Sequence, residues 1–121
     1  MVPLRLVRKN LQAAYGNPEI LSDETVDRYY DLMLAPGVRE AMLARMEQTI
    51  LEDPRPLLRR IQVPVLLVWG GKDAMIPAGN AADYERELPN ATLALFPQLG
   101  HVPQEEAPDE TVAAVRAFLA H

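Results

Sequence analysis

The sequence predicts an α/β fold in which a helical segment over residues 1–56 precedes a β-α-β-α unit over residues 57–121. In the first segment, apolar residues recur at the spacing of amphipathic helices. In the second, two short apolar runs alternate with helical patterns. Strands that alternate with helices in this way pair in parallel through a right-handed crossover. The chain of 121 residues is therefore expected to be one domain, or a piece of one, that contains a small parallel sheet.

Two helices are predicted before residue 36. Apolar residues at helical spacing predict the first over residues 4–14, and the stretch "YGNP" (Tyr15–Pro18) ends it. Ser22 is a suitable cap for the second helix, because its hydroxyl oxygen can accept a hydrogen bond from a free amide of the first turn. Pro36–Gly37 breaks this second helix.

A third helix is predicted over residues 38–51, and the stretch "EDPRP" (Glu52–Pro56) marks the boundary between the two segments. Two prolines separated by one residue cannot lie inside a helix. Flexible, apolar methionine side chains fill irregular spaces, so four of them are expected in the core or in a pocket wall. These are Met33, Met42, Met46 and Met75.

The second segment begins with a strand over residues 63–69, with Pro64 at its start, where a strand tolerates proline. This run has no polar face, which is typical of a strand covered on both faces. A helix over residues 80–88, a strand over 92–96 and a helix from Pro108 follow. Four residues of the last helix are expected to face inward, namely Val112, Val115, Phe118 and Leu119.

Composition excludes several classes of function. The net charge is −5 and no basic stretch exceeds two residues, so nucleic acid and anionic membranes are poor candidate partners. The chain has no cysteine, which excludes disulfides and thiolate metal sites. No signal peptide or apolar run of about 20 residues is present, and we expect a cytoplasmic protein. Gly70–Gly71 does not form a phosphate-loop pattern, and we expect neither a cofactor nor a metal site.

Asp73 and His101 follow the two predicted strands directly. Parallel strands lie about 4.8 Å apart and end at the same edge of the sheet, where open α/β sheets bind ligands. A carboxylate there can orient an imidazole and stabilise its protonated form. Either residue alone is more often an ordinary turn or loop residue, and only their matched positions favour a catalytic pair. His121, the other histidine, is expected to be frayed at the chain end.

The same stretches resemble the C-terminal part of an α/β-hydrolase. "IQVPVLLVWGGKDAMIP" is similar to the strand and loop that carry the triad acid, and "LGHVPQEEAPDETVAAVRAFL" to the histidine loop and last helix. The resemblance implies that Asp73 is the triad acid, His101 the base and Glu106 a structural residue of the loop. Residues 1–56 resemble the end of a helical cap. From the residues alone, Glu105 and Glu106 are expected on a solvated approach to the last helix.

The nucleophile elbow G-x-S-x-G that the family places before the cap is absent. The chain has one serine, Ser22, and its position is typical of a helix cap. The sequence therefore predicts a fragment or subunit of a hydrolase that supplies the acid and histidine for hydrolysis of an ester-like small molecule and is inactive alone. A non-catalytic interaction module with a hydrolase-derived fold is the alternative. In either case we expect self-association or pairing with a missing N-terminal segment.

Overall fold

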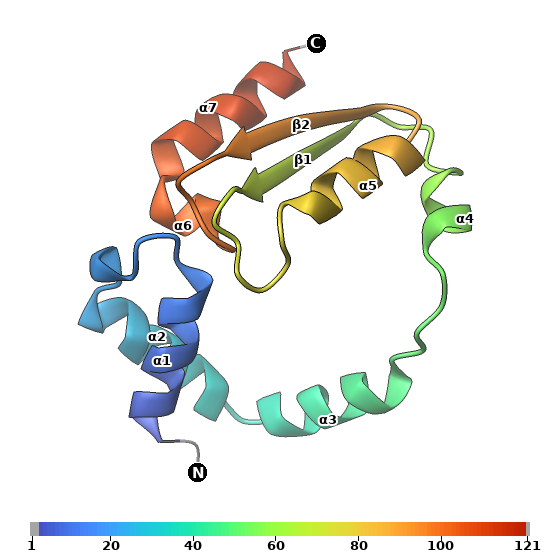
Figure 1. Cartoon of the computed structure of the whole chain (residues 1–121). Coiled ribbons are helices and arrows are strands. Elements are labelled where there is room, and N and C mark those ends of the chain that lie inside the picture. The colour runs from blue at the N-terminus through green and yellow to red at the C-terminus, as the bar shows by residue number, and fades with distance from the viewer. Residues whose placement is uncertain (1–2, 121) are drawn as a thin grey trace.

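The structure is a computed structural model and describes residues 3–120, so the prediction for His121 lies outside the described residues. Seven α-helices, one short 3-10 helix and two strands follow one another in these residues (Figure 1). Their bounds are α1 Leu4–Ala14, η1 Pro18–Ile20, α2 Asp23–Leu34, α3 Val38–Gln48, α4 Arg55–Leu58, β1 Val65–Gly70, α5 Gly79–Glu87, β2 Ala91–Phe96, α6 Pro103–Glu106 and α7 Pro108–Leu119. None of the helices in residues 3–120 is both long and apolar enough to cross a membrane.

The two strands form a parallel sheet, as predicted, with Val65 opposite Ala91 and Gly70 opposite Phe96. Helix α5 connects them and packs its Tyr84 ring against Trp69 of β1, with ring centroids 5.8 Å apart. Leu66 lies three residues before Trp69 and therefore points to the other face of the sheet, where it lines a depression together with residues of α7. The α/β class is thus confirmed, with one helix beside each face of the sheet.

Helix α7 covers its face of the sheet only in part, which corrects the prediction that four of its residues face inward. Val112 and Val115 are exposed, and Leu119 is 75% exposed although it lines the same depression as Leu66. Helix α7 instead buries Thr111, which donates to the carbonyl oxygens of Pro103 and Ala107. The reason is that α7 carries apolar residues around more than one face, and only one of these faces meets this two-stranded sheet.

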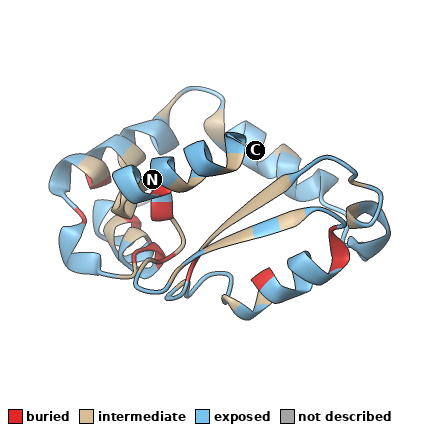
Figure 2. Ribbon diagram, turned by 90° about the horizontal axis from the view of Figure 1, so that it is seen from above, coloured by how far each residue is buried: buried red, intermediate tan, exposed pale blue. Residues whose placement is uncertain are grey.

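The most deeply buried cluster lies in the helical segment rather than on the sheet (Figure 2). Ala14, Tyr15, Leu21 and Val26 form it, at the junction of α1, η1 and α2. Val102, which follows His101, packs against this cluster. The core of the described chain therefore connects the helical segment to the loop that follows β2.

Helix α3 lies apart from the sheet and packs mainly against the end of α2 (Figure 1). It ends at Gln48, three residues earlier than predicted, and contains no buried residue. Met33, Met42, Met46 and Met75 are exposed rather than core residues, and Met46 is 73% exposed. Met33, Met42 and Met46 instead line a shallow cavity of about 230 Å³ between α2 and α3, which fits the expectation of a pocket wall.

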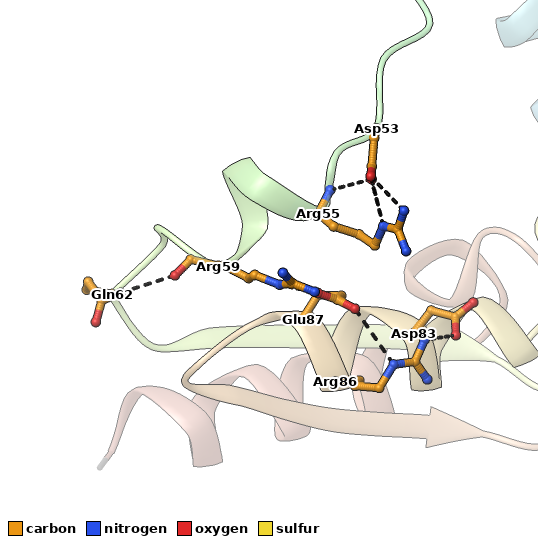
Figure 3. A network of polar contacts seen from close by, with 7 residues as sticks. All are labelled: Asp53, Arg55, Arg59, Gln62, Asp83, Arg86 and Glu87. Carbon is orange, nitrogen blue, oxygen red and sulfur yellow. Dashed lines mark hydrogen bonds and ion pairs between the residues drawn. The ribbon is translucent and has the colours of Figure 1, made fainter.

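Charged residues tie the linker after α3 to the α/β unit (Figure 3). Asp53 pairs with Arg55 at the start of α4, a short helix that the sequence did not predict. Arg59, just after α4, donates to the carboxylate of Glu87 at 2.7 Å, and Arg86 lies 3.7 Å from the same carboxylate. Glu87 is buried, so its carboxylate depends mainly on Arg59 for charge balance, because Arg86 pairs more closely with Asp83, at 2.6 Å.

Candidate active site

Asp73 is held by the turn that follows β1. Its Oδ1 accepts hydrogen bonds from the amides of Met75 at 2.9 Å and Ile76 at 2.8 Å, the arrangement by which aspartate stabilises a tight turn. The side chain is only 6% exposed. Because Oδ1 is used by the turn, Oδ2 is directed to a different partner.

That partner is His101, which follows β2. The distance between His101 Nδ1 and Asp73 Oδ2 is 2.9 Å, so the structure brings together the two residues predicted to pair. An ionised carboxylate only accepts hydrogen bonds, and Nδ1 is therefore the nitrogen that carries the proton. Among residues 3–120, Nε2 of His101 has no hydrogen-bond partner. This nitrogen is left as the acceptor for an incoming proton.

Burial and hydrogen bonding act in opposite directions on the pKa of Asp73. Burial raises the pKa, because it disfavours the charged carboxylate. The Ile76 amide, His101 and the Met75 amide stabilise the ionised form, and together they hold the pKa of Asp73 below its ordinary value. The carboxylate is thus kept charged beside the imidazole, as an orienting acid requires.

Backbone contacts fix the loop that carries His101. The His101 amide donates to the carbonyl oxygen of Ala14 at 2.6 Å. Glu106 accepts from the amide of Gly100 at 2.6 Å and from the amide of Gly16 at 2.8 Å. Its carboxylate therefore bridges the histidine loop, residues 99–106, and the end of α1.

Glu105 is half-buried and hydrogen-bonded, contrary to the expectation of a solvated position. It accepts a hydrogen bond from the hydroxyl of Tyr15 at 2.8 Å and another from the hydroxyl of Tyr29 at 2.6 Å. Burial, followed by the bond to Glu105, raises the pKa of Tyr15, and the bond to Glu105 raises the pKa of Tyr29 to about 12. Both hydroxyls therefore stay neutral donors. No local sequence signal connects these residues, which lie far apart in the chain.

A mostly apolar cavity of about 350 Å³ opens beside His101. Met33 of α2, Leu11 of α1 and Met75 of the acid turn contribute to its wall, as does the ring of Tyr29. This volume lies at the lower end of the range for small-molecule sites, which are typically apolar with few polar groups. A small molecule with an apolar part can thus approach the imidazole.

Ser22 caps helix α2 and is not part of the Asp73–His101 pair. Its hydroxyl oxygen accepts from the Thr25 amide at 3.1 Å, as predicted for a helix cap. It is the one serine in the sequence, which also lacks cysteine. Within the described part of the chain, no group of three or more His, Asp or Glu side chains is placed to hold a metal ion. The site therefore pairs a carboxylate with an imidazole, and no serine or cysteine lies beside them among the described residues.

The chain is similar to a known protein family and to individual known proteins. A family profile described as "alpha/beta hydrolase fold" matches residues 3–108. The chain is 33% identical over 109 residues to the dihydrolipoyllysine-residue acetyltransferase component of an acetoin cleaving system from Pseudomonas putida, covering 87% of this chain and 28% of the relative. It is 40% identical over 66 residues to a pimeloyl-[acyl-carrier protein] methyl ester esterase from Nitrosomonas europaea, covering 54% of this chain and 26% of the relative.

Solved structures resemble the chain over nearly its whole length. A serine hydrolase involved in carbazole degradation (the CarC enzyme) superposes with a TM-score of 0.86 and 22% identity, covering 98% of this chain and 47% of that protein. The meta-cleavage product hydrolase CumD from Pseudomonas fluorescens IP01 gives a TM-score of 0.83 with 18% identity, covering 99% and 46%. The chain thus spans less than half the length of each of these four relatives.

Proposed function

Because the chain belongs to the α/β-hydrolase fold family, we propose that Asp73 and His101 are the acid and the general base of a hydrolase catalytic triad. The single observation that carries this proposal is the 2.9 Å contact between His101 Nδ1 and Asp73 Oδ2 at the carboxyl edge of the sheet. In this assignment, residues 1–56 are the end of a helical cap and residues 57–121 the C-terminal part of the hydrolase core.

The nucleophile is supplied by a segment other than these 121 residues. It attacks the carbonyl carbon of an ester-like small molecule and gives its proton to Nε2 of His101, while Asp73 stabilises the imidazolium that forms. His101 then returns that proton to the leaving alkoxide, and the acyl group stays bound to the nucleophile. A water molecule that gives a proton to the same nitrogen attacks this acyl group, and His101 passes the proton back to the nucleophile as the carboxylic acid is released. The apolar cavity beside His101 supports a substrate with an apolar part.

The proposal requires that the isolated chain does not hydrolyse esters by this mechanism. The test compares the chain alone with the same chain fused to the segment encoded directly upstream, using p-nitrophenyl acetate and butyrate. We expect saturable turnover from the fusion only, abolished by His101→Ala. Turnover that is insensitive to His101→Ala, or the absence of a G-x-S/D/C-x-G elbow upstream, would refute the proposed triad.

One observation favours a second candidate, a non-catalytic interaction module. Large apolar residues remain exposed on α3, on the linker and around the sheet, as expected of a surface that binds another protein. Met42, Ile50, Leu51, Val63 and Leu119 are examples. The two candidates differ in one result, because only the hydrolase assignment makes the activity of a reconstituted protein depend on both Asp73 and His101.

A further inference from the structure

We propose that Glu105 is a positioning residue for His101, which it fixes through Tyr15 and Tyr29 of the helical segment. The inference rests on the proposed function, because it concerns the orientation of the proposed base. Glu105 itself does not line the cavity beside His101. Its effect on the imidazole is therefore transmitted through the backbone of the histidine loop and through the residues to which that loop is bound.

Three consecutive residues at the end of α1 bind the histidine loop. The carbonyl oxygen of Ala14 accepts from the His101 amide at 2.6 Å, the hydroxyl of Tyr15 donates to Glu105 at 2.8 Å, and the amide of Gly16 donates to Glu106 at 2.8 Å. The bond at Ala14 holds the residue that carries the imidazole, and the two others hold the helical turn that follows it. The position of His101 therefore depends on the position of this short segment, in which α1 ends and the following loop begins.

The two backbones touch without side chains between them. A Cβ atom on Gly16 would overlap the carbonyl oxygen of Gln98, and one on Gly100 would overlap the carbonyl oxygen of Ala14. Packed interiors of this kind transmit small displacements rather than absorb them. A movement of Tyr15 away from the loop would therefore shift the backbone that carries His101.

Glu105 connects the histidine loop to residues of two helical elements. It is the common acceptor for two hydroxyls that come from different elements, Tyr15 after α1 and Tyr29 within α2. Hydrogen bonds to an ionised acceptor are stronger than those between neutral groups, so the carboxylate holds both helices to the loop at once. Tyr29 also lines the cavity beside His101, which places this contact directly behind the cavity wall.

The orientation of the imidazole has a direct spectroscopic signature. Asp73 selects the tautomer of His101 in which Nδ1 carries the proton, and a ring that turns away from Asp73 loses this selection. We would therefore record two-bond 1H–15N spectra of the neutral imidazole in a His121→Ala background, which leaves a single histidine. Asp73→Asn gives the reference spectrum for a ring without its acid.

We expect the Nδ1–H tautomer to predominate in the background protein and to fall toward the Asp73→Asn reference in Glu105→Gln. Glu110→Gln, at an exposed position in the first turn of α7, is the matched control and should leave the tautomer unchanged. A Glu105→Gln protein that keeps its amide dispersion and its full Nδ1–H signal would overturn the inference. A background protein that itself lacks the signal would instead refute the pairing on which the proposed function depends.

A milder variant covers the case in which Glu105→Gln prevents folding. Tyr29→Phe removes one of the two hydroxyl donors and keeps the ring in the cavity wall. We expect a partial fall of the Nδ1–H tautomer, smaller than that of Asp73→Asn, together with faster hydrogen exchange of the His101 amide. If Tyr29→Phe changes neither quantity, Glu105 does not position His101.

Discussion

At the scale of single residues, Asp73 divides its two oxygens between a turn and an imidazole. Asp73→Asn keeps an oxygen for the Met75 and Ile76 amides but removes the charge that binds His101. We expect a loss of about 1–3 kcal/mol in the free energy of unfolding at pH 7, the usual cost of weakening a hydrogen bond to a charged group. Urea unfolding of both proteins measures it.

The same substitution has a defined pH dependence. Because the folded protein lowers the pKa of Asp73, the ionised carboxylate stabilises the fold at pH values above its unfolded pKa of about 3.9. This contribution disappears as the pH falls through the lower, folded value. The difference in stability between wild type and Asp73→Asn should therefore shrink in that acid range. A difference in stability that stays constant from pH 7 into this acid range would contradict the lowered pKa of Asp73.

Tyr29 gives the corresponding prediction at alkaline pH. Its bond to Glu105 raises its pKa to about 12, so the neutral hydroxyl stabilises the fold fully below the unfolded pKa of about 10. That stability is lost as the pH rises from about 10 through about 12. Absorbance at 295 nm follows tyrosine ionisation, and Tyr29→Phe should remove amplitude from the late part of the titration. Loss from the early part would show that the Glu105 contact does not form.

At the scale of elements, two glycines at element ends are expected to respond oppositely to alanine. A Cβ atom on Gly70, the last residue of β1, would overlap backbone oxygens of Leu99 and Gly100. We expect Gly70→Ala to cost about 1–3 kcal/mol. Gly79, the first residue of α5, has open space around the same position, so Gly79→Ala should add about 0.5–1 kcal/mol. Thermal unfolding compares them, and a stable Gly70→Ala would show that β1 does not press on the histidine loop.

The sequence predicted the strands, α5 and α7 closely because their signals are local. An uninterrupted apolar run marks β1, and Pro108 marks the start of α7. The pair of Asp73 and His101 was also predictable, because chain topology alone brings the ends of neighbouring parallel strands together. Helices α4 and α6 were missed because each is four residues long, too short for a periodic pattern.

The contacts of Glu105 were not predictable, because they depend on how α1 and α2 pack against the loop. Its hydroxyl partners lie 90 and 76 residues away in the sequence, where no periodicity connects them. The inward face of α7 was assigned only partly correctly for a related reason, since Phe118 and Leu119 line the depression beside the sheet whereas Val112 and Val115 are exposed. A helix with apolar residues on several sides does not reveal which side a small sheet covers.

At the scale of the whole molecule, the chain exposes far more surface than a monomer of its size. Its accessible surface is 8945 Å², whereas the scaling for folded monomers gives roughly 6500 Å² for a chain of this length. Burial of apolar area contributes about 25 cal/mol per Å² before the entropic cost of association is subtracted, so covering the apolar part of this excess favours association. We therefore expect the isolated chain to form a dimer or larger assembly.

Light scattering across a dilution series measures that association. We expect a mass above that of one chain at micromolar concentration, and a return to monomer when the segment that carries the nucleophile is supplied as a fusion. Val63→Lys and Leu119→Lys, both at exposed apolar positions, should weaken assembly without unfolding the chain. A compact, cooperatively folding monomer at every concentration would show that the chain is stable with these apolar surfaces exposed to solvent.

The distance in sequence between the two partners of Glu105 and Glu105 itself also bears on how the chain reaches its native state. The two contacts of Glu105 span 90 and 76 residues, and folding slows as the mean separation of contacting residues grows. During synthesis, Tyr15 and Tyr29 leave the ribosome long before residue 105 exists. We therefore expect the histidine loop to reach its native position late in folding, after α1 and α2 have formed.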